Sequence, residues 1–150
     1  MPDPIIQAAQ EAFKLRLQDN NDVSANTKNA QAIAKTWRSL VHDLDPNRYL
    51  IETMVTPSLD QKVDVVDTTA GTAYEFKVSG KNATAEFYKD VVKVIIWNEK
   101  RKSKLSRLVF ITDEEHGRPF IDAPMPRAYI EYLKGHGLEV VVAYVHRDET

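Results

Sequence analysis

The sequence predicts an α/β fold in which a mixed central β-sheet is flanked by helices. Three observations support this: two N-terminal segments with helical spacing, three β-prone segments in the middle, and alternating helix and strand patterns towards the C-terminus. The chain has 150 residues, 43% of them hydrophobic, which suits a single domain over residues 1–150.

Two helices are expected first. One runs from Pro4 to about Gln18, because Asp3-Pro4 is typical of a cap followed by proline in the first turn. The other ends at Asp45-Pro46 and places its apolar residues on one stripe: Ala30, Ile33, Ala34, Trp37, Leu40, Val41 and Leu44. We expect Trp37, and likewise Trp97, to lie in the core rather than to stack on bases.

Five strands and two more helices complete the prediction. Tyr49–Val55, Val63–Asp67 and Ala73–Ser79 are expected to form antiparallel strands. Ala83–Trp97 is predicted as a helix, although its β-branched residues also suit a buried strand. A strand over Leu105–Thr112, a loop around His116, a helix over Pro126–Lys134 and a strand buried on both faces over Leu138–Val145 follow.

The amino-acid composition limits the kinds of partner and metal site that the protein can have. The 20 Lys and Arg residues against 22 Asp and Glu give a net charge of −2, so any nucleic acid must be met by a local basic patch. The chain has no cysteine, and its four histidines (His42, His116, His136, His146) lack metal-ligand spacing. With no charged leader and no run near the roughly 20 apolar residues of a membrane helix, we expect a cytoplasmic protein.

Charged residues interrupt the second and third predicted strands. Because side chains alternate along a strand, Glu75 and Lys77 share one face while Tyr74 and Phe76 take the other. An even number of residues in the connecting loop would set Asp64 opposite Lys77 on that charged face, whereas an odd number would bring in Asp67. The sequence leaves both registers open.

Two carboxylates and a lysine at one point suit phosphodiester hydrolysis. Magnesium prefers oxygen ligands and accepts one or two protein carboxylates. A bound ion polarises the phosphate, and a nearby ammonium stabilises charge that develops on the phosphoryl oxygens. We therefore expect a magnesium-dependent site. The alternative without a functional site is a solvent-exposed strand face that carries a cross-strand ion pair.

Asp64, ten intervening residues and then Glu75-Phe76-Lys77 resemble the motif of the PD-(D/E)xK nuclease superfamily, which includes restriction endonucleases and Holliday-junction resolvases. The resemblance covers about residues 49–112, with Val63 where the motif has proline. It implies a restriction endonuclease-like core in which Asp64, Glu75 and the Phe76 carbonyl bind Mg²⁺ and Lys77 orients water or stabilises charge. In that family an additional acid often comes from upstream, and Glu11 or Glu52 is the candidate.

These residues predict an endodeoxyribonuclease that acts on double-stranded DNA, with a type II restriction endonuclease as first choice and a junction resolvase or repair nuclease as second. Because one such site cuts one strand, we expect a homodimer, with the helix that carries Trp37 in the contact. The basic run Lys100, Arg101, Lys102 and Lys104 either grips DNA phosphates or forms an ordinary polar loop. There are two rival hypotheses. The chain is a non-catalytic nucleic-acid-binding module, or it is a soluble α/β domain whose function does not involve nucleic acid.

Overall fold

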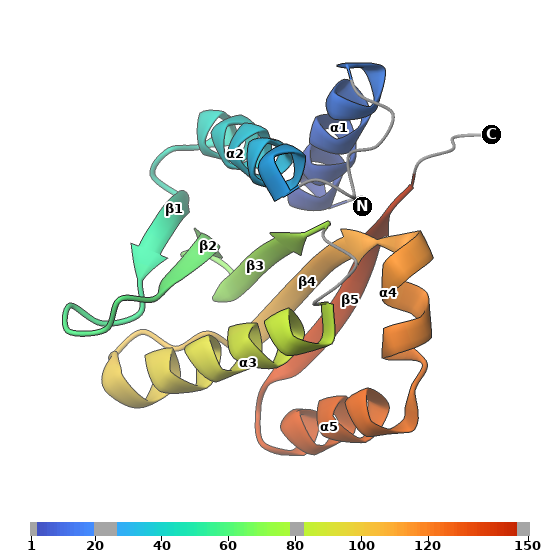
Figure 1. The fold of residues 1–150 in the computed structure, drawn as a ribbon. Helices are drawn as coiled ribbons and strands as arrows, with labels where there is room; N and C mark the ends of the chain where they lie inside the picture. Colours follow the sequence, from blue (N-terminus) through green and yellow to red (C-terminus); the bar gives the residue numbers. More distant parts are fainter. Residues whose placement is uncertain (1–2, 20–26, 79–82, 147–150) are drawn as a thin grey trace.

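A computed structural model describes residues 3–19, 27–78 and 83–146. Figure 1 shows a β-sheet with helices on both of its faces. The elements in chain order are α1 (Pro4–Asp19), α2 (Thr27–Leu44), β1 (Tyr49–Met54), β2 (Lys62–Asp67), β3 (Thr72–Lys77), α3 (Ala83–Lys100), β4 (Arg107–Asp113), α4 (Glu114–Ile121), α5 (Pro124–Gly135) and β5 (Glu139–Val145).

The sheet is mixed, as the sequence predicted. Its five strands follow the order β1-β2-β3-β4-β5. The first three form an antiparallel meander, while β3, β4 and β5 are parallel to one another. The switch occurs at β3 because α3 carries the chain back before β4 begins, as a parallel connection requires.

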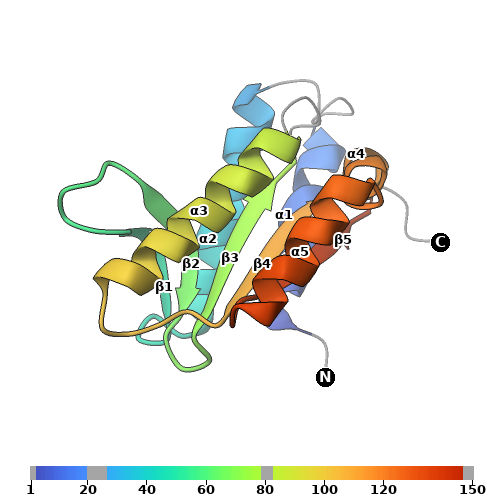
Figure 2. The ribbon, with the colours of Figure 1, turned by 90° about the horizontal axis from the view of Figure 1, so that it is seen from below.

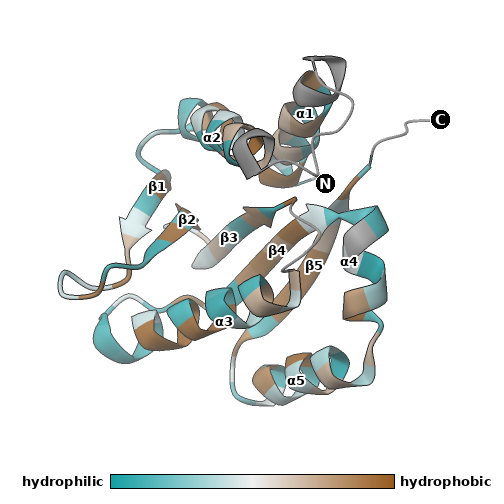
Figure 3. Cartoon of the chain, in the orientation of Figure 1, coloured by the Kyte–Doolittle hydropathy of each residue, from teal (hydrophilic) through white to brown (hydrophobic). Residues whose placement is uncertain are grey.

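Two apolar clusters lie on opposite faces of this sheet. In Figure 1, α1 and α2 lie on one side and α3 and α5 on the other, and Figure 2 shows α3 and α5 over the sheet, with their axes roughly along the strands. Phe13, Trp37 and Phe76 belong to the cluster under α1 and α2, whereas Phe87 and Phe110 belong to the cluster under α3. Figure 3 shows β4 as hydrophobic along most of its length, consistent with a strand covered on both faces.

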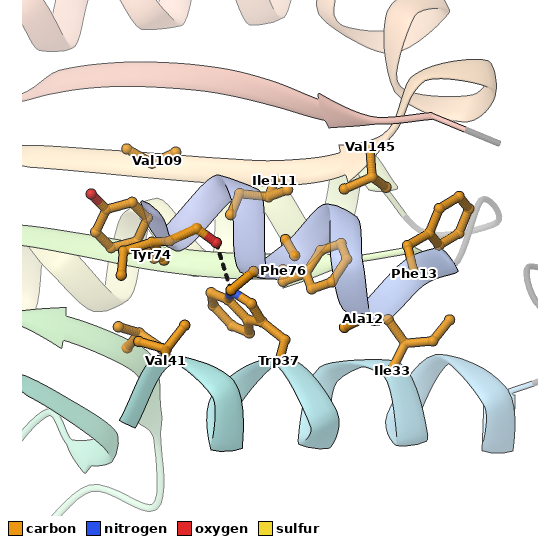
Figure 4. Packing of buried hydrophobic residues seen from close by; sticks show 14 of the residues in the cluster. Ala12, Phe13, Ile33, Trp37, Val41, Tyr74, Phe76, Val109, Ile111 and Val145 are labelled. Atoms are coloured by element: carbon orange, nitrogen blue, oxygen red, sulfur yellow. Dashed lines mark hydrogen bonds between the residues drawn. The ribbon is translucent and has the colours of Figure 1, made fainter. Parts of the chain in front are cut away.

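Trp37 anchors α2 to the rest of the molecule. Its side chain is fully buried, its indole N–H donates to the Ile5 carbonyl at 3.1 Å, and its ring meets Phe76 edge-on at 5.4 Å (Figure 4). The prediction that Trp37 lies in the core is confirmed, and so is that for Trp97. The indole of Trp37 is fully used within the molecule, and the expectation that α2 contributes to a dimer contact stays a prediction.

Most predicted elements are confirmed with small shifts of their ends. The helix alternative for residues 83–97 is the correct one. Ser79, at the end of the predicted strand Ala73–Ser79, lies outside the described residues. Within the described ranges, none of the helices combines the length and the hydropathy needed to cross a lipid bilayer.

Two predictions near the C-terminus are wrong. His116 lies in helix α4 rather than in a loop, because the Asp113 carboxylate caps that helix by accepting the Glu115 N–H at 3.1 Å. Strand β5 is not buried on both faces, because it stands at the edge of the sheet. Val140 and Val145 are buried there, but the residues between them are only half-buried.

Candidate active site

The β2–β3 hairpin decides which acid joins Glu75 and Lys77. Its pairs run from Asp67↔Thr72 to Val65↔Tyr74, around a turn of four residues, 68–71. This even count puts Asp64, not Asp67, on the charged face, as the even-loop alternative predicted. The exact partner differs from the prediction, because the same register carried one residue further sets Asp64 against Glu75 instead of Lys77.

Strand β1 is irregular opposite Asp64. The β1–β2 pairs run to Ile51↔Val65 and resume at Thr53↔Val63, and Glu52 between them has a φ of 47°. A positive φ in the middle of a strand is unusual for a residue other than glycine. Val65 packs under α1 and α2 while Val63 packs under α3, so the alternation of faces shifts at Asp64.

At this irregular point the side chains replace the backbone ladder between β2 and β3. The Asp64 N–H donates to Glu75 Oε2 at 3.3 Å, and the Phe76 N–H approaches Asp64 Oδ2 at 3.5 Å. Each carboxylate is thereby oriented by the backbone of the other strand. The two acids lie together because the strands separate at this point of the hairpin.

Lys77 completes the group. Its Nζ atom lies 3.7 Å from Asp64 Oδ2 and 3.7 Å from Glu75 Oε1. The exposed fractions of the side chains are 26% for Lys77, 16% for Asp64 and 1% for Glu75. The three predicted residues therefore converge, and solvent reaches them on the side of Lys77 and Asp64.

Helix α3 adds two charged residues that the sequence analysis missed. Lys93 Nζ lies 2.9 Å from Glu75 Oε2 and 3.0 Å from Asp90 Oδ1, and it donates to the Lys62 carbonyl at 2.7 Å. A signal was present, since Asp90 falls on the apolar stripe formed by Phe87, Val91 and Val94. A carboxylate at such a position is costly to bury unless it has a partner.

The pKa values reflect this burial. Burial raises the pKa of Glu75 well above that of a solvated carboxyl, and the Asp64 and Asp90 carboxylates raise it further. Burial also raises the pKa of Asp90, to about 6, against the opposing effect of Lys93. By itself burial would lower the pKa values of Lys77 and Lys93, but the surrounding carboxylates outweigh it and raise both.

The donor set fits a magnesium ion in part. Among the described residues, no group of three or more His, Cys, Asp or Glu side chains is arranged to hold a metal. Magnesium does not need such a group, because it accepts one or two protein carboxylates and keeps several waters. Glu75 Oε1 is buried and has no hydrogen-bond partner within the described ranges. That oxygen, Asp64 and the Phe76 carbonyl are the groups that would hold the ion.

Asp67 has a different task. Its carboxylate receives the Arg48 guanidinium at 2.9 and 3.0 Å and accepts the N–H groups of Thr69 and Ala70 at 3.0 and 3.1 Å. These bonds close the β2–β3 turn. Asp67 is therefore a structural residue, and Asp64 is the acid that lies beside Glu75 and Lys77.

Neither predicted additional acid reaches the group. Glu52 Oε1 lies 3.7 Å from the Arg38 guanidinium of α2, and its side chain is 53% exposed. Glu11 is exposed on α1, which packs over the opposite face of the sheet. Asp90 from α3 is the third carboxylate instead, because the helix after the hairpin covers the face to which Glu75 points.

The basic run follows the C-terminal end of α3. Lys100 and Lys102 are exposed, whereas Arg101 donates to the Val55 and Met54 carbonyls at 2.9 and 2.5 Å and lies 3.9 Å above the Trp97 ring. Lys104 donates to the Asn98 and Arg101 carbonyls. Arg101 and Lys104 thus hold the loop together, which leaves Lys100 and Lys102 as the freely exposed cations of the predicted patch.

Comparison of the chain with protein-family models, with curated proteins and with solved structures finds no match.

Proposed function

We propose that this protein is a magnesium-dependent endodeoxyribonuclease that hydrolyses phosphodiester bonds of double-stranded DNA. The observation that carries the proposal is the convergence of Asp64, Glu75 and Lys77, with the Lys77 ammonium 3.7 Å from an oxygen of each acid. The residue types match the PD-(D/E)xK motif, and the meander of β1–β3 followed by α3 and β4 matches the expected succession of elements.

Each residue has a role in this proposal. Asp64 and Glu75 bind the metal, with the Phe76 carbonyl as a further ligand. When bound, magnesium supplies Lewis-acid polarisation of the scissile phosphate. Lys77 stays protonated because the two carboxylates raise its pKa, so it neutralises charge that develops on the phosphoryl oxygens or orients the attacking water.

Within this class we propose a type II restriction endonuclease that acts as a homodimer, with a junction resolvase or repair nuclease as the alternative. A duplex-cutting enzyme needs one site for each strand, and two-fold symmetry brings two sites to one duplex. An intact four-way junction and a linear duplex of the same sequence, offered at equal concentration, distinguish the two, because a resolvase cuts the junction first.

The deciding experiment is plasmid cleavage with and without Mg²⁺. We expect cleavage only with the metal, and a rate at least about 100-fold lower for Lys77→Ala and for Glu75→Ala, the loss typical when an electrostatic contributor to a transition state is removed. Lys35→Ala, an exposed lysine on α2, is the matched control and keeps the parent rate. Cleavage that survives both site substitutions would refute the proposal.

A second candidate is a non-catalytic nucleic-acid-binding module. The observation in its favour is the 2.9 Å pair between Lys93 and Glu75, which partly neutralises the acid without any metal. In the same experiment this candidate predicts DNA binding without cleavage at any Mg²⁺ concentration.

A further inference from the structure

Lys93 is bound on all sides in the interior of the molecule. Its side chain is 8% exposed, and its ammonium contacts Glu75 Oε2, Asp90 Oδ1 and the Lys62 carbonyl at 2.9, 3.0 and 2.7 Å. The contact to the Lys62 carbonyl is a hydrogen bond, and the contacts to Glu75 and Asp90 are ion pairs at hydrogen-bond distance. A lysine held in this way joins α3 to both β2 and β3, and its burial keeps it away from a substrate.

The contacts of Lys93 make the two oxygens of Glu75 unequal. Oε2 receives Lys93 and the Asp64 N–H. Oε1 is buried, has no hydrogen-bond partner within the described ranges and lies on the side of Lys77. Because Oε2 already contacts Lys93, only Oε1 of Glu75 can bind a further cation.

We propose that Lys93, held in place by Asp90, is a positioning residue that orients Glu75 and leaves Oε1 as the oxygen that would bind a metal ion. The inference rests on the proposed function, because it assigns Glu75 as a metal ligand. Some residues orient a metal ligand without touching the metal. Replacing such a residue typically weakens metal binding about 10- to 100-fold.

A positioning effect of Lys93 can be separated from the effect of its charge on metal binding. The cluster holds three carboxylates, Asp64, Glu75 and Asp90, and two ammonium groups, Lys77 and Lys93, which leaves one excess negative charge. The double variant Lys93→Gln with Asp90→Asn retains two carboxylates and one ammonium, and hence the same excess. It also avoids the unpaired buried carboxylate of Asp90 that Lys93→Gln alone would leave. The double variant therefore removes the positioning interaction while the formal charge stays constant.

The experiment is a titration of the DNA-free protein with Mn²⁺, followed by electron paramagnetic resonance of the free ion. We expect the double variant to bind Mn²⁺ about 10- to 100-fold more weakly than the parent. Lys93→Arg, which keeps a charged donor, should recover part of the affinity. Lys89→Gln, an exposed lysine one turn earlier on α3, is the matched control and should bind like the parent.

Equal Mn²⁺ affinity in the parent and the double variant would overturn the assignment of Lys93. Should the double variant fail to fold, judged by circular dichroism, the comparison of Asp90→Asn with the parent decides, because Asp90 holds Lys93 in place, and unchanged affinity in Asp90→Asn overturns the assignment. The readout is independent of cleavage. A parent that binds Mn²⁺ but never cuts DNA refutes the proposed function while the role of Lys93 is still tested.

Discussion

Asp64 and Asp67 lie on the same short strand, yet their surroundings give them different tasks. Asp67 is surrounded by donors, since Arg48 and two turn N–H groups satisfy its carboxylate. Asp64 shares its surroundings with a second acid, and the nearest cation, Lys77, lies at 3.7 Å. The hydrogen bonds of Asp67 stabilise the turn. Two neighbouring carboxylates repel each other, and a bound cation relieves this repulsion.

This difference predicts that Asp67→Asn affects stability and leaves cleavage intact. Burial would raise the pKa of Asp67, but the hydrogen bonds from Arg48, Ala70 and Thr69 outweigh it and lower the pKa. A lowered pKa stabilises the fold above the pKa of the unfolded chain, about 3.9, and this contribution is lost as the pH falls through the folded value. We expect Asp67→Asn to lower the Tm by a few degrees at pH 7.

Thermal unfolding of the parent and Asp67→Asn between pH 7 and pH 2 checks the prediction. The two Tm values should begin to converge below about pH 4, where the unfolded carboxyl takes up its proton, and should coincide once the pH lies below the pKa of the folded state. Asp64→Asn is the companion variant, expected to abolish cleavage. Loss of cleavage in Asp67→Asn with a parent-like Tm would assign the catalytic role to Asp67.

Helix α4 shows how a short element depends on its packing. Its glycine, Gly117, lies where a β-carbon would overlap the Thr112 Cγ2 methyl and come within 3.0 Å of Tyr144 Cε1. The absence of a side chain therefore allows α4 to approach β4 and β5 closely. Asp113 supplies the cap that begins this helix, at the end of β4.

We predict that Gly117→Ala destabilises the protein. Alanine favours a helix by up to about 1 kcal/mol over glycine, but overpacking a tight interior contact typically costs about 1–3 kcal/mol. The second effect outweighs the first, so the free energy of unfolding should fall by about 1 kcal/mol or more. Urea denaturation measures it.

Gly135 provides the control for this substitution. It lies at the C-terminal end of α5, and a β-carbon there would meet nothing within 4 Å. Gly135→Ala should leave stability unchanged or raise it slightly. If Gly117→Ala were as stable as Gly135→Ala, the close approach of α4 to the sheet would not be a constraint on this residue.

For the molecule as a whole, the net charge determines how strongly DNA is attracted to the protein. The net charge of −2 provides no general attraction for a polyanion. Lys100 and Lys102 are exposed at the end of α3, the helix that also carries Lys93. Duplex binding should therefore depend on a small number of phosphate contacts and be only moderately sensitive to salt.

We predict that the double variant Lys100→Ala with Lys102→Ala weakens binding to any duplex and makes the salt dependence shallower, by about 0.9 in the slope for each phosphate that the variant no longer neutralises. Fluorescence anisotropy of a labelled duplex at several KCl concentrations measures the slope. Arg101→Ala is the contrast, because its guanidinium bonds within the protein, and it should lower the Tm. A slope unchanged in the double variant would make the run a solubilising loop.

The sequence by itself determined the features that depend on local periodicity. The stripe of α2 and the alternation of Tyr74, Phe76 and Val78 predicted the elements and their buried faces, because 3.6- and 2-residue repeats follow directly from backbone geometry. The same alternation put Glu75 and Lys77 on one face. The mixed character of the sheet followed from the succession of these patterns along the chain.

Only the tertiary structure decided the features that depend on contacts between distant segments. The register at Asp64 required the hydrogen bonds of the turn, which Asp67 and Arg48 supply across 19 residues. Asp90 and Lys93 join the site because α3 folds back over β2 and β3, and no local pattern specifies which face a helix covers. Helix α4 packs closely on β4 and β5 because Gly117 has no side chain, whereas in sequence Glu114-Glu115-His116-Gly117 indicates a loop. Such choices are made by packing, which a linear pattern does not contain.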